Sequence, residues 1–483
     1  MDDAVKLGGK VRVLRRRDGI SQAELAQRLG ISPSYLNLIE SNKRALTAAL
    51  LLRLAQIFKV DIGSFASEDD NRLAADLAEV FVDPMFEPHD LTNVDVRELA
   101  NGSPNMARAT LTLYRAYVAA RDATHALANR LSEDEASSVD RPDLPTEEVS
   151  DFIQRHKNHF APIEDAAADL WREARLDADD VYAGLVQHMT KKLGIRVKVV
   201  RVGDERKAMR RYDPKKKIVG ISEVLPPRSR RFQVAHQLGL LSLSSVFDEI
   251  VHADKDLTTS EARALARVVL ANYFASAVLM PYEPFLEAAR AERYDIELLA
   301  HRFGASFEQV CHRLTSLGRK GREGVPFHML RIDMAGNISK RFSNSGIRIA
   351  RFSGACPRWN IHSAFLTPGM IRVQISRMPD GAIYFCLART LRSDRGGYNV
   401  PHTVHAIGMG CDIRYARELV YSDGVDLASI ERGDHQAVVP VGVTCRLCEH
   451  LDCAQRAFPP LLHPLRVEEN VRGVSFYAPV PSE

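Results

Sequence analysis

The segment FQVAHQLGLL, residues 232–241, has helical spacing and one histidine where a zinc-binding helix carries its first ligand. In the pattern His-Glu-x-x-His, two histidines on one helical face bind zinc and the glutamate acts as general base. Here His236 takes the first ligand position, while Gln237 replaces the base and Leu240 replaces the second ligand. An amide is no base at neutral pH and leucine binds no metal, so the segment predicts a helix without zinc chemistry. The plainer alternative is a buried amphipathic helix with one histidine.

A second pattern with metal-binding potential lies near the C-terminus. Three of the seven cysteines, Cys445, Cys448 and Cys453, fall within nine residues, and thiolates in one loop can share one metal unit. We favour a [4Fe–4S] cluster, with zinc as the alternative; each takes four ligands. Three unrelated free thiols are the plainer interpretation.

The fourth ligand is predicted from its local context. We favour Cys356, which lies in a predicted loop and is followed by Pro357, because a proline often follows a cluster cysteine. Cys411 is the alternative, whereas Cys311 and Cys386 have apolar neighbours and are predicted core residues. A zinc site would instead favour one of the histidines His402, His405 and His450.

Length and composition bound the architecture. The chain has 483 residues, enough for about three domains, and its 45% hydrophobic and 26% charged content is ordinary for a soluble globular protein. The net charge is only +3, but residues 1–65 contain eleven Lys or Arg and six Asp or Glu. The acidic start lacks the apolar region of a signal peptide, and the longest apolar run, residues 268–281, is too short to span a bilayer. We therefore expect a cytoplasmic protein with no membrane segment.

Residues 1–65 predict a helix-turn-helix unit. Ser21 caps a first helix over residues 21–29, with Glu24 completing a capping box, and Gly30 ends it. Ser32 caps a second helix that starts at Pro33. A core for five short helices is expected from Leu14, Leu25, Ala26, Leu29, Ile31, Leu36, Leu38, Leu54 and Ile57.

In such a unit the N-terminal end of the second helix enters the major groove of double-stranded DNA. Ser34, Tyr35 and Asn37 lie there and are predicted to meet base edges, next to the cap Ser32. Contacts with the phosphate backbone are predicted for Gln22, Asn42, Lys43 and Arg44. The segments Ser21–Ala26 and Ser32–Glu40 resemble the XRE (lambda-repressor-like) DNA-binding family.

Residues 66–146 are predicted to connect the helix-turn-helix unit, which we call the reader, to the rest of the chain. Residues 103–131 predict one long helix, with Met106, Leu113, Tyr117, Leu127 and Leu131 roughly along one side. Such a stripe can be core or a dimer seam. We favour the seam of a homodimer, because a helix-turn-helix reader usually needs a two-fold partner to reach two half-sites.

Residues 147–325 predict an α+β domain of helices, a strand at 195–201, a hairpin at 209–222, the His236 helix and a helix from 260 to 277. This order resembles the IrrE/ImmA-like metallopeptidases, whose second helix carries the third zinc ligand; Leu270 stands at that position here. The resemblance therefore implies a degenerate peptidase domain without its metal. An apolar cavity is expected to remain and to form a small-ligand pocket at His236, Gln237, Tyr273 and Phe274.

Residues 326–483 predict a second α+β domain, with hairpins at 326–340 and 370–387. Together with the preceding domains, the chain resembles the short-chain fatty acyl transcriptional regulators (the ScfR family). The segments that carry this resemblance include Ser306–Leu314, Gly324–Phe327, Cys356–Asn360, Tyr384–Thr390 and Cys445–Cys448.

The resemblance implies a multidomain bacterial regulator of acyl-CoA metabolic genes: an all-α helix-turn-helix reader, an α+β pseudo-metallopeptidase domain and an α+β C-terminal domain with a cysteine cluster. It implies an acyl-CoA-type effector, and the cluster would add a redox input. Two alternatives come from other classes, an active metallopeptidase that cleaves a repressor and an effector-independent antitoxin-like or phage-like repressor. Gln237, Leu240 and Leu270 argue against the first.

Overall fold

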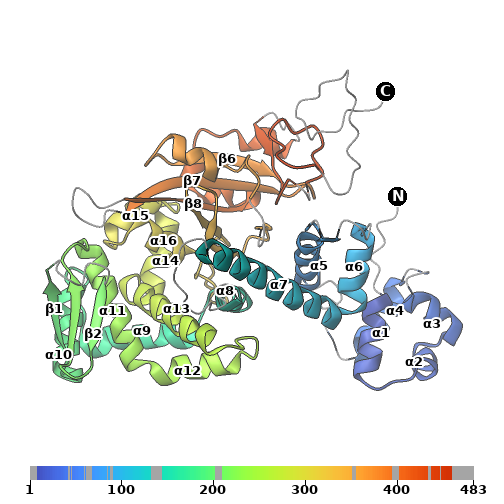
Figure 1. The fold of residues 1–483 in the computed structure, drawn as a ribbon, viewed down its shortest axis with the longest axis horizontal. Coiled ribbons are helices and arrows are strands. Elements are labelled where there is room, and N and C mark those ends of the chain that lie inside the picture. The colour runs from blue at the N-terminus through green and yellow to red at the C-terminus, as the bar shows by residue number, and fades with distance from the viewer. Residues whose placement is uncertain are drawn as a thin grey trace. The chain divides into compact units, whose positions relative to one another are not determined.

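The structure is a computed structural model. It describes residues 8–41, 44, 46–58, 60, 68–83, 85–86, 91–131, 144–201, 209–350, 355–393, 402–432, 437–445 and 448–459. The chain forms two compact units (Figure 1). Unit 1 comprises residues 1–141, 350–353 and 444–483, and unit 2 comprises residues 142–349 and 354–443.

Unit 1 begins with the four reader helices α1 (Gly8–Arg17), α2 (Gln22–Leu29), α3 (Pro33–Glu40) and α4 (Ala48–Phe58). The sequence predicted five helices up to residue 65; the described part of this region holds four. Their apolar faces enclose a small core that includes Leu25, Leu29, Leu36, Ile39 and Leu54. The predicted helix-turn-helix is therefore present.

Three further helices of unit 1 pack together, α5 (Glu68–Val80), α6 (Asn93–Gly102) and α7 (Pro104–Leu131). The long predicted helix is confirmed as α7. Its buried side carries Ala107, Leu111 and Tyr114, whereas Met106 and Leu113 are 64% and 72% exposed. The predicted stripe thus faces away from the core of unit 1.

The first part of unit 2 is a helical layer beside a small sheet. Its helices are α8 (Leu144–Arg155), α9 (Ala161–Ala174), α10 (Val181–Leu193), α11 (Pro227–Ser242), α12 (Ser244–Ala253) and α13 (Ser260–Leu279). Strands β1 (Arg196–Val200), β2 (Arg210–Asp213) and β3 (Ile218–Ser222) pair in the order β1-β3-β2, with β1 parallel to β3. The predicted strand and hairpin are confirmed.

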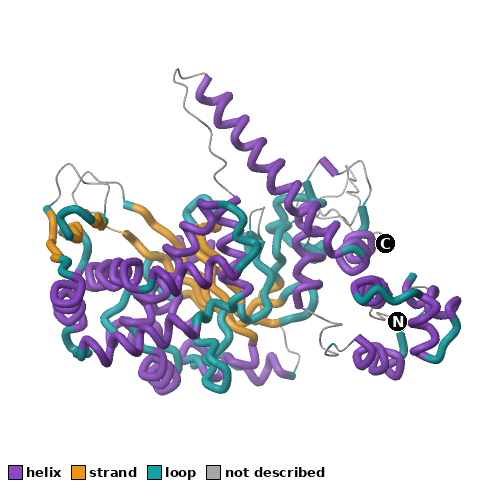
Figure 2. Tube along the Cα trace, turned by 90° about the horizontal axis from the view of Figure 1, so that it is seen from below, coloured by secondary structure: helices purple, strands orange, loops and turns teal. Residues whose placement is uncertain are grey.

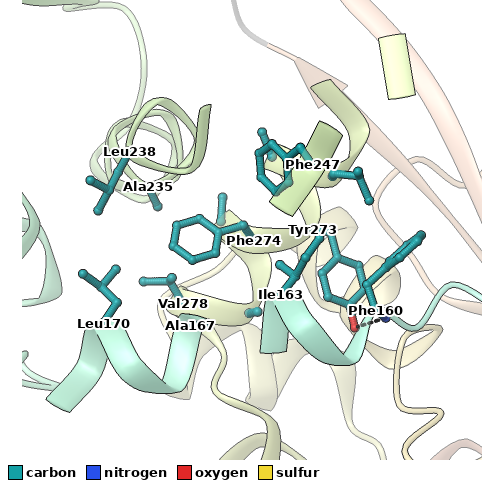
Figure 3. Packing of buried hydrophobic residues seen from close by; sticks show 14 of the residues in the cluster. Phe160, Ile163, Ala167, Leu170, Ala235, Leu238, Phe247, Tyr273, Phe274 and Val278 are labelled. Atoms are coloured by element: carbon teal, nitrogen blue, oxygen red, sulfur yellow. Dashed lines mark hydrogen bonds between the residues drawn. The ribbon is translucent and has the colours of Figure 1, made fainter. Parts of the chain in front are cut away.

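Helix α13 lies against α8, α9 and α11 in the core of this layer (Figure 3). It is long and apolar enough to cross a membrane by composition alone, but 56% of the window that meets this criterion is buried inside the protein. Gly239 of α11 permits the close approach, because a Cβ there would lie 2.7 Å from Cδ1 of Phe274.

The second part of unit 2 starts with α14 (Tyr282–Ala291), α15 (Ile296–Arg302) and α16 (Phe307–Leu314). A six-stranded sheet follows, in the order β5-β4-β8-β7-β6-β9. Its strands are β4 (His328–Ile332), β5 (Ile338–Ser343), β6 (Arg372–Arg377), β7 (Ile383–Ser393), β8 (Thr403–Asp412) and β9 (Val438–Pro440). Figure 2 shows this sheet among the surrounding helices.

Both faces of the large sheet are covered. Successive residues of a strand point to opposite faces, so Phe385 and Leu387 of β7 pack with α14–α16. Tyr384 and Cys386 pack on the other face, with Trp359 and the short helix α17 (Asn360–Ser363). The predicted hairpins are confirmed as β4–β5 and β6–β7, while the central strand β8 was not predicted.

A buried ion pair joins the two parts of unit 2. The Arg313 guanidinium of α16 donates to both carboxylate oxygens of Glu164 in α9, at 2.6 and 2.9 Å, and to the carbonyl of Met280. Tyr273 of α13 donates its hydroxyl proton to the same carboxylate at 2.6 Å. Burial alone would raise the pKa of Glu164, but the charge and hydrogen bonds of Arg313 overcome this and lower it.

We expect Glu164→Ala to destabilise unit 2 by about 3–5 kcal/mol, because it leaves the Arg313 charge buried and unpaired. Since the folded pKa of Glu164 is depressed, its contribution is present above the unfolded value near 4.5 and is lost as the pH falls below that value. Denaturant unfolding between pH 3 and pH 8 measures both effects. The control is Glu173→Gln, which breaks the exposed pair with Lys192 and should cost less than about 1 kcal/mol. Equal losses of unfolding free energy for the two variants would contradict the stabilising role of the Glu164–Arg313 pair.

Candidate functional site

The turn between α2 and α3 is built from the predicted capping residues. The Ser21 hydroxyl accepts from the backbone N–H of Glu24, and the Ser32 hydroxyl accepts from the N–H of Tyr35. Gly30 ends α2 at φ 70°, in the left-handed conformation that favours glycine. The Glu24 carboxylate accepts a hydrogen bond from Arg28. The turn fixes the angle at which α3 leaves α2.

The outer face of α3 carries the predicted base-reading residues. Ser34 and Asn37 are exposed and Tyr35 is half-buried. Leu38 was predicted to be a core residue, but it is 39% exposed. The physical reason is helical geometry: Leu36 and Ile39 turn towards the core, and Leu38 lies beside Asn37 on the outer side. An exposed leucine there can pack on a thymine methyl group, a role similar to the apolar base contacts of other readers.

Glu40 holds the reading helix in place. Its carboxylate is 3% exposed and accepts two hydrogen bonds from Arg15 of α1, at 2.6 and 3.0 Å. It also accepts one from the side-chain nitrogen of Gln22 at 3.0 Å. The sequence placed Gln22 on a phosphate; in the structure this contact with Glu40 orients the start of α2. The phosphate contact remains a prediction.

The predicted backbone-contacting loop is partly described. Asn42 and Lys43 lie outside the described residues. The guanidinium of Arg44 lies over the Tyr35 ring, 5.1 Å from its centroid. This contact places a cation next to the reading face, where a phosphate oxygen of bound DNA would be attracted.

An arginine lies against the degenerate zinc helix. Arg210 of β2 hydrogen-bonds Nδ1 of His236 and the side-chain oxygen of Gln233. Burial and the Arg210 charge lower the pKa of His236 to about 4, so the ring is neutral at pH 7 and its Nδ1 lone pair accepts the Arg210 proton. A metal cation at Nδ1 would have to displace this hydrogen bond and face a positive charge.

The other altered zinc positions are part of the core. Leu270 is fully buried, and Leu240 packs against the same cluster. Tyr273 and Phe274, predicted to border a ligand pocket with His236 and Gln237, are also buried in this cluster (Figure 3). The two cavities described in unit 2 are lined by other residues, and the predicted pocket of four residues stays a prediction.

One of these cavities is a groove of about 340 Å³ between the start of α9 and the end of α12. Tyr273 supports its wall, because its hydroxyl contacts the backbone N–H of Phe160 at 3.4 Å and Nδ1 of His159 at 3.4 Å. Burial lowers the pKa of His159, so its ring is neutral at pH 7. The lining residues are His156, His159, Phe160, Ala161, Pro162, Glu249, Ile250 and Ala253.

The cysteine loop lies in unit 1. Burial raises the pKa of Cys448; nearby Arg456 opposes this rise, while Cys445 and Cys453 add to it. Within the described residues, no group of three His, Cys, Asp or Glu side chains is arranged to hold a metal ion. The metal site therefore stays a prediction.

The remaining cysteines have distinct environments. Cys311 lies in α16 and Cys386 in β7, both buried as predicted. Cys411, the alternative fourth ligand, is a fully buried residue of β8. Cys356 belongs to unit 2, where its backbone N–H donates to the carbonyl of Val443 at 3.0 Å. The structure does not test its role as a ligand.

Three family models match successive parts of the chain. They are described as helix-turn-helix over residues 11–65, IrrE N-terminal-like domain over residues 190–315, and short-chain fatty acyl coenzyme A regulator, C-terminal, over residues 316–477. A transcriptional regulator of Mycobacterium tuberculosis, RamB, is 40% identical over 479 residues, which cover 98% of each chain. The chain belongs to the short-chain fatty acyl coenzyme A regulator family.

Further relatives support the same family assignment. The transcriptional regulator PrpR of Mycobacterium tuberculosis is 39% identical, and the match to this chain covers 93% of PrpR. The propionyl-CoA carboxylase regulator of Cereibacter sphaeroides is 39% identical and is covered over 98%. A solved structure of a Mycobacterium tuberculosis transcriptional regulator, 42% identical, matches 69% of this chain and 99% of its own with a TM-score of 0.66. The predicted family and the predicted class, a DNA-binding transcription regulator, are confirmed.

We expect Asn37→Ala and Leu38→Ala each to weaken binding to the operator by about 1–3 kcal/mol and to leave binding to random DNA nearly unchanged, because both side chains lie on the exposed face of α3. Lys43→Ala is the matched control. A phosphate contact is independent of base sequence, so this variant should weaken both DNAs equally and flatten the salt dependence. Binding isotherms at several salt concentrations measure both quantities. Equal loss on both DNAs for Asn37→Ala would refute its base-reading role.

Proposed function

We propose that this regulator is a cytoplasmic homodimer that binds operator DNA through α3 and changes its DNA affinity when a short-chain acyl-CoA binds. The observation that carries this proposal is the combination in one chain of an exposed reading face, braced by Glu40, and a C-terminal region that matches the acyl coenzyme A regulator model over residues 316–477. The name of the Cereibacter sphaeroides relative points to propionyl-CoA metabolism.

The IrrE-like part of unit 2 acts in this proposal as a scaffold and not as a peptidase. The general base is replaced by Gln237, and Leu240 and Leu270 replace two metal ligands. Arg210 adds a second obstacle, since its guanidinium hydrogen-bonds Nδ1 of His236 and its positive charge opposes a metal cation beside the ring. A metallopeptidase site needs a metal-bound water and a base, and these four residues supply neither.

The groove beside α9 has the chemistry to hold the acyl end of the effector. Its volume of about 340 Å³ lies in the range of small-molecule sites. Phe160, Pro162 and Ile250 offer apolar walls for a short acyl chain. His159 and Glu249 offer hydrogen-bond acceptors for the amide N–H groups of the pantetheine arm. Tyr273 connects this groove to the Glu164–Arg313 pair.

We expect propionyl-CoA to raise the unfolding temperature of the full chain, because a ligand bound only by the native state stabilises it, by about 2.7 kcal/mol at one hundred times Kd. Ala253→Trp should abolish the rise by filling the groove. Ala291→Trp, on the exposed end of α14, is the matched control and should retain it. Thermal shift and operator binding with propionyl-CoA measure the response.

The outcomes separate the alternatives. If propionyl-CoA raises the unfolding temperature of the wild type and of both tryptophan variants, the groove is not the binding site, but the protein still responds to acyl-CoA. No rise and no change in operator binding for the wild type would reject the response itself and favour an effector-independent repressor.

The cysteine loop supports a proposed metal site. Cys445, Cys448 and Cys453 supply three soft ligands from one segment, the donor set expected for a [4Fe–4S] cluster or for zinc. Cys356 remains our fourth ligand. His450 is the alternative, because its Nε2 is buried without a hydrogen-bond partner among the described residues, and it would favour zinc. Metal analysis of Cys356→Ser and His450→Ala decides between the two.

The exposed stripe of α7 supports the homodimer. Met106, Leu113 and Tyr117 are separated by seven and four residues and share one helical face. All three are at least 37% exposed. A second copy is the occupant that suits a reader with one recognition helix, because two copies reach two half-sites. The side chains of Leu127 and Leu131, which would extend the stripe, lie outside the described residues.

We expect Leu113→Glu to convert the dimer to a monomer, because two copies would bury like charges in an apolar seam. Thr112→Glu is the matched control, since Thr112 is exposed on another side of the same helix. Sedimentation velocity measures the mass of the protein in solution. Binding to DNA with one or with two half-sites measures whether loss of the dimer weakens operator binding. A monomeric wild type, or a dimer that Leu113→Glu leaves intact, would refute the seam.

A further inference from the structure

Positive charge is concentrated in one segment of unit 2. Residues 191–231 contain fifteen Lys or Arg and four Asp or Glu, a net charge of +11. Residues 1–65, which include the reader helices, carry a net charge of +5, and the whole chain carries only +3. The rest of the chain is therefore acidic. The described parts of the basic segment are the end of α10, the three-stranded sheet β1-β3-β2 and the start of α11, at one end of unit 2 (Figure 1).

The two faces of this small sheet differ. On one face, Val219 and Ile221 of β3 are fully buried in the core. Arg210 of β2 pairs with Ile221 and points to the same face, where it contacts α11. Successive residues of a strand point to opposite faces, so Gly220 and Arg211 lie on the other side. We call this second side the outer face of the sheet.

Basic side chains occupy the outer face in register. Lys198 of β1 and Arg211 of β2 both pair with Gly220 of the central strand β3, so the three residues lie in one row. Lys198 and Arg211 are exposed, and two strand spacings, about 10 Å, separate them. Arg196 lies two residues before Lys198, is exposed and shares its face. The outer face therefore presents three exposed cations from two strands.

The turn between β2 and β3 adds three more lysines. Lys215, Lys216 and Lys217 are all exposed. Asp213, at the end of β2, accepts the backbone N–H groups of Lys215 and Lys216 at its Oδ1, each at 3.0 Å. Its carboxylate therefore fixes the turn that displays the lysines. Like charges held this close repel one another and destabilise the folded state, a cost that a bound polyanion would reduce.

We propose that the outer face of β1-β3-β2 and its lysine turn form a second DNA-binding surface, which contacts the phosphate backbone next to the operator and reads no base sequence. The chemistry fits, because Lys and Arg bind phosphates and such contacts carry no sequence information. The occupant is double-stranded DNA, because the reader of the same chain holds it and so raises its effective concentration at other surfaces of the protein. The inference goes beyond operator reading by α3. It needs neither the acyl-CoA effector nor the homodimer.

The test compares a short operator, which covers only the site read by α3, with the same operator extended on both sides by random sequence. Full-length wild type is measured beside Lys198→Glu/Arg211→Glu, which reverses both charges of the outer row. The matched control is Lys255→Glu/Lys320→Glu, which makes the same change of charge at two exposed lysines of unit 2 outside residues 191–231. Lys216→Glu, on the exposed turn, is a second variant that leaves the strands unchanged. Binding isotherms at several salt concentrations and the unfolding temperature are measured for each protein.

We expect the wild type to bind the extended operator more tightly than the short one, with a steeper salt dependence. Two phosphate contacts would make this advantage shrink about tenfold between 50 mM and 200 mM salt. Lys198→Glu/Arg211→Glu should lose the advantage, keep its unfolding temperature and bind the short operator as the control does. Lys216→Glu should lose part of the advantage, and Lys255→Glu/Lys320→Glu should keep it.

Four other results would contradict this inference or separate it from the proposed function. Equal affinity and equal salt dependence of the wild type for the two operators would reject the second surface and leave operator reading intact. Loss of the advantage in the control as well would show an effect of net charge and not of the sheet. If Lys198→Glu/Arg211→Glu loses only its thermal response to propionyl-CoA, the face binds the phosphates of CoA instead of DNA. A wild type that does not prefer the operator to random DNA would reject operator reading by α3, and the second surface would then stand only if Lys198→Glu/Arg211→Glu weakens binding to random DNA.

Discussion

Unit 2 depends on the buried pair between Glu164 and Arg313. It joins α9 of the IrrE-like layer to α16 under the large sheet, and Tyr273 of α13 shares its carboxylate. A buried ion pair is weak evidence for stability, but breaking it is expensive and its geometry is specific. The pair therefore fixes the register between the two layers. It also supports the groove wall, since Tyr273 contacts Phe160 and His159 at the edge of that groove.

Local sequence patterns predicted the helices and strands well where a capping residue or a single buried face determines the element. Ser21, Gly30 and Ser32 determined the reader's turn, and the alternation of apolar residues predicted β1. The turn residues around Gly336 and Gly381 predicted the two hairpins of the large sheet. The central strand β8 escaped prediction because it is buried on both faces and contains Gly408 and Gly410, so it shows neither alternation nor clear strand propensity. Leu38 was misplaced for a related reason: an apolar residue on a reading face has the same sequence signal as one in the core.

The sequence could predict which residues form the candidate sites, but not which side chains from other elements contact them. The prediction of a degraded metal site at His236, Gln237 and Leu270 needs only the sequence, because the chemistry of each position is local. Arg210 is 26 residues from His236 and lies on another element, so only the fold brings its guanidinium to the ring. The same holds for Glu40, whose partners Arg15 and Gln22 are 25 and 18 residues away. Cys411 is a further example, since only the fold shows that this candidate ligand lies near the end of the buried strand β8.

Three arginines, of which Arg313 and Arg456 are buried and Arg210 is half-buried, then share one physical logic. Arg313 meets a carboxylate, Arg210 meets a neutral histidine where a peptidase would hold its metal, and Arg456 meets only carbonyls beside three thiols. A guanidinium can satisfy several acceptors from one position and does not lose its charge, so it can replace a metal as an organising cation.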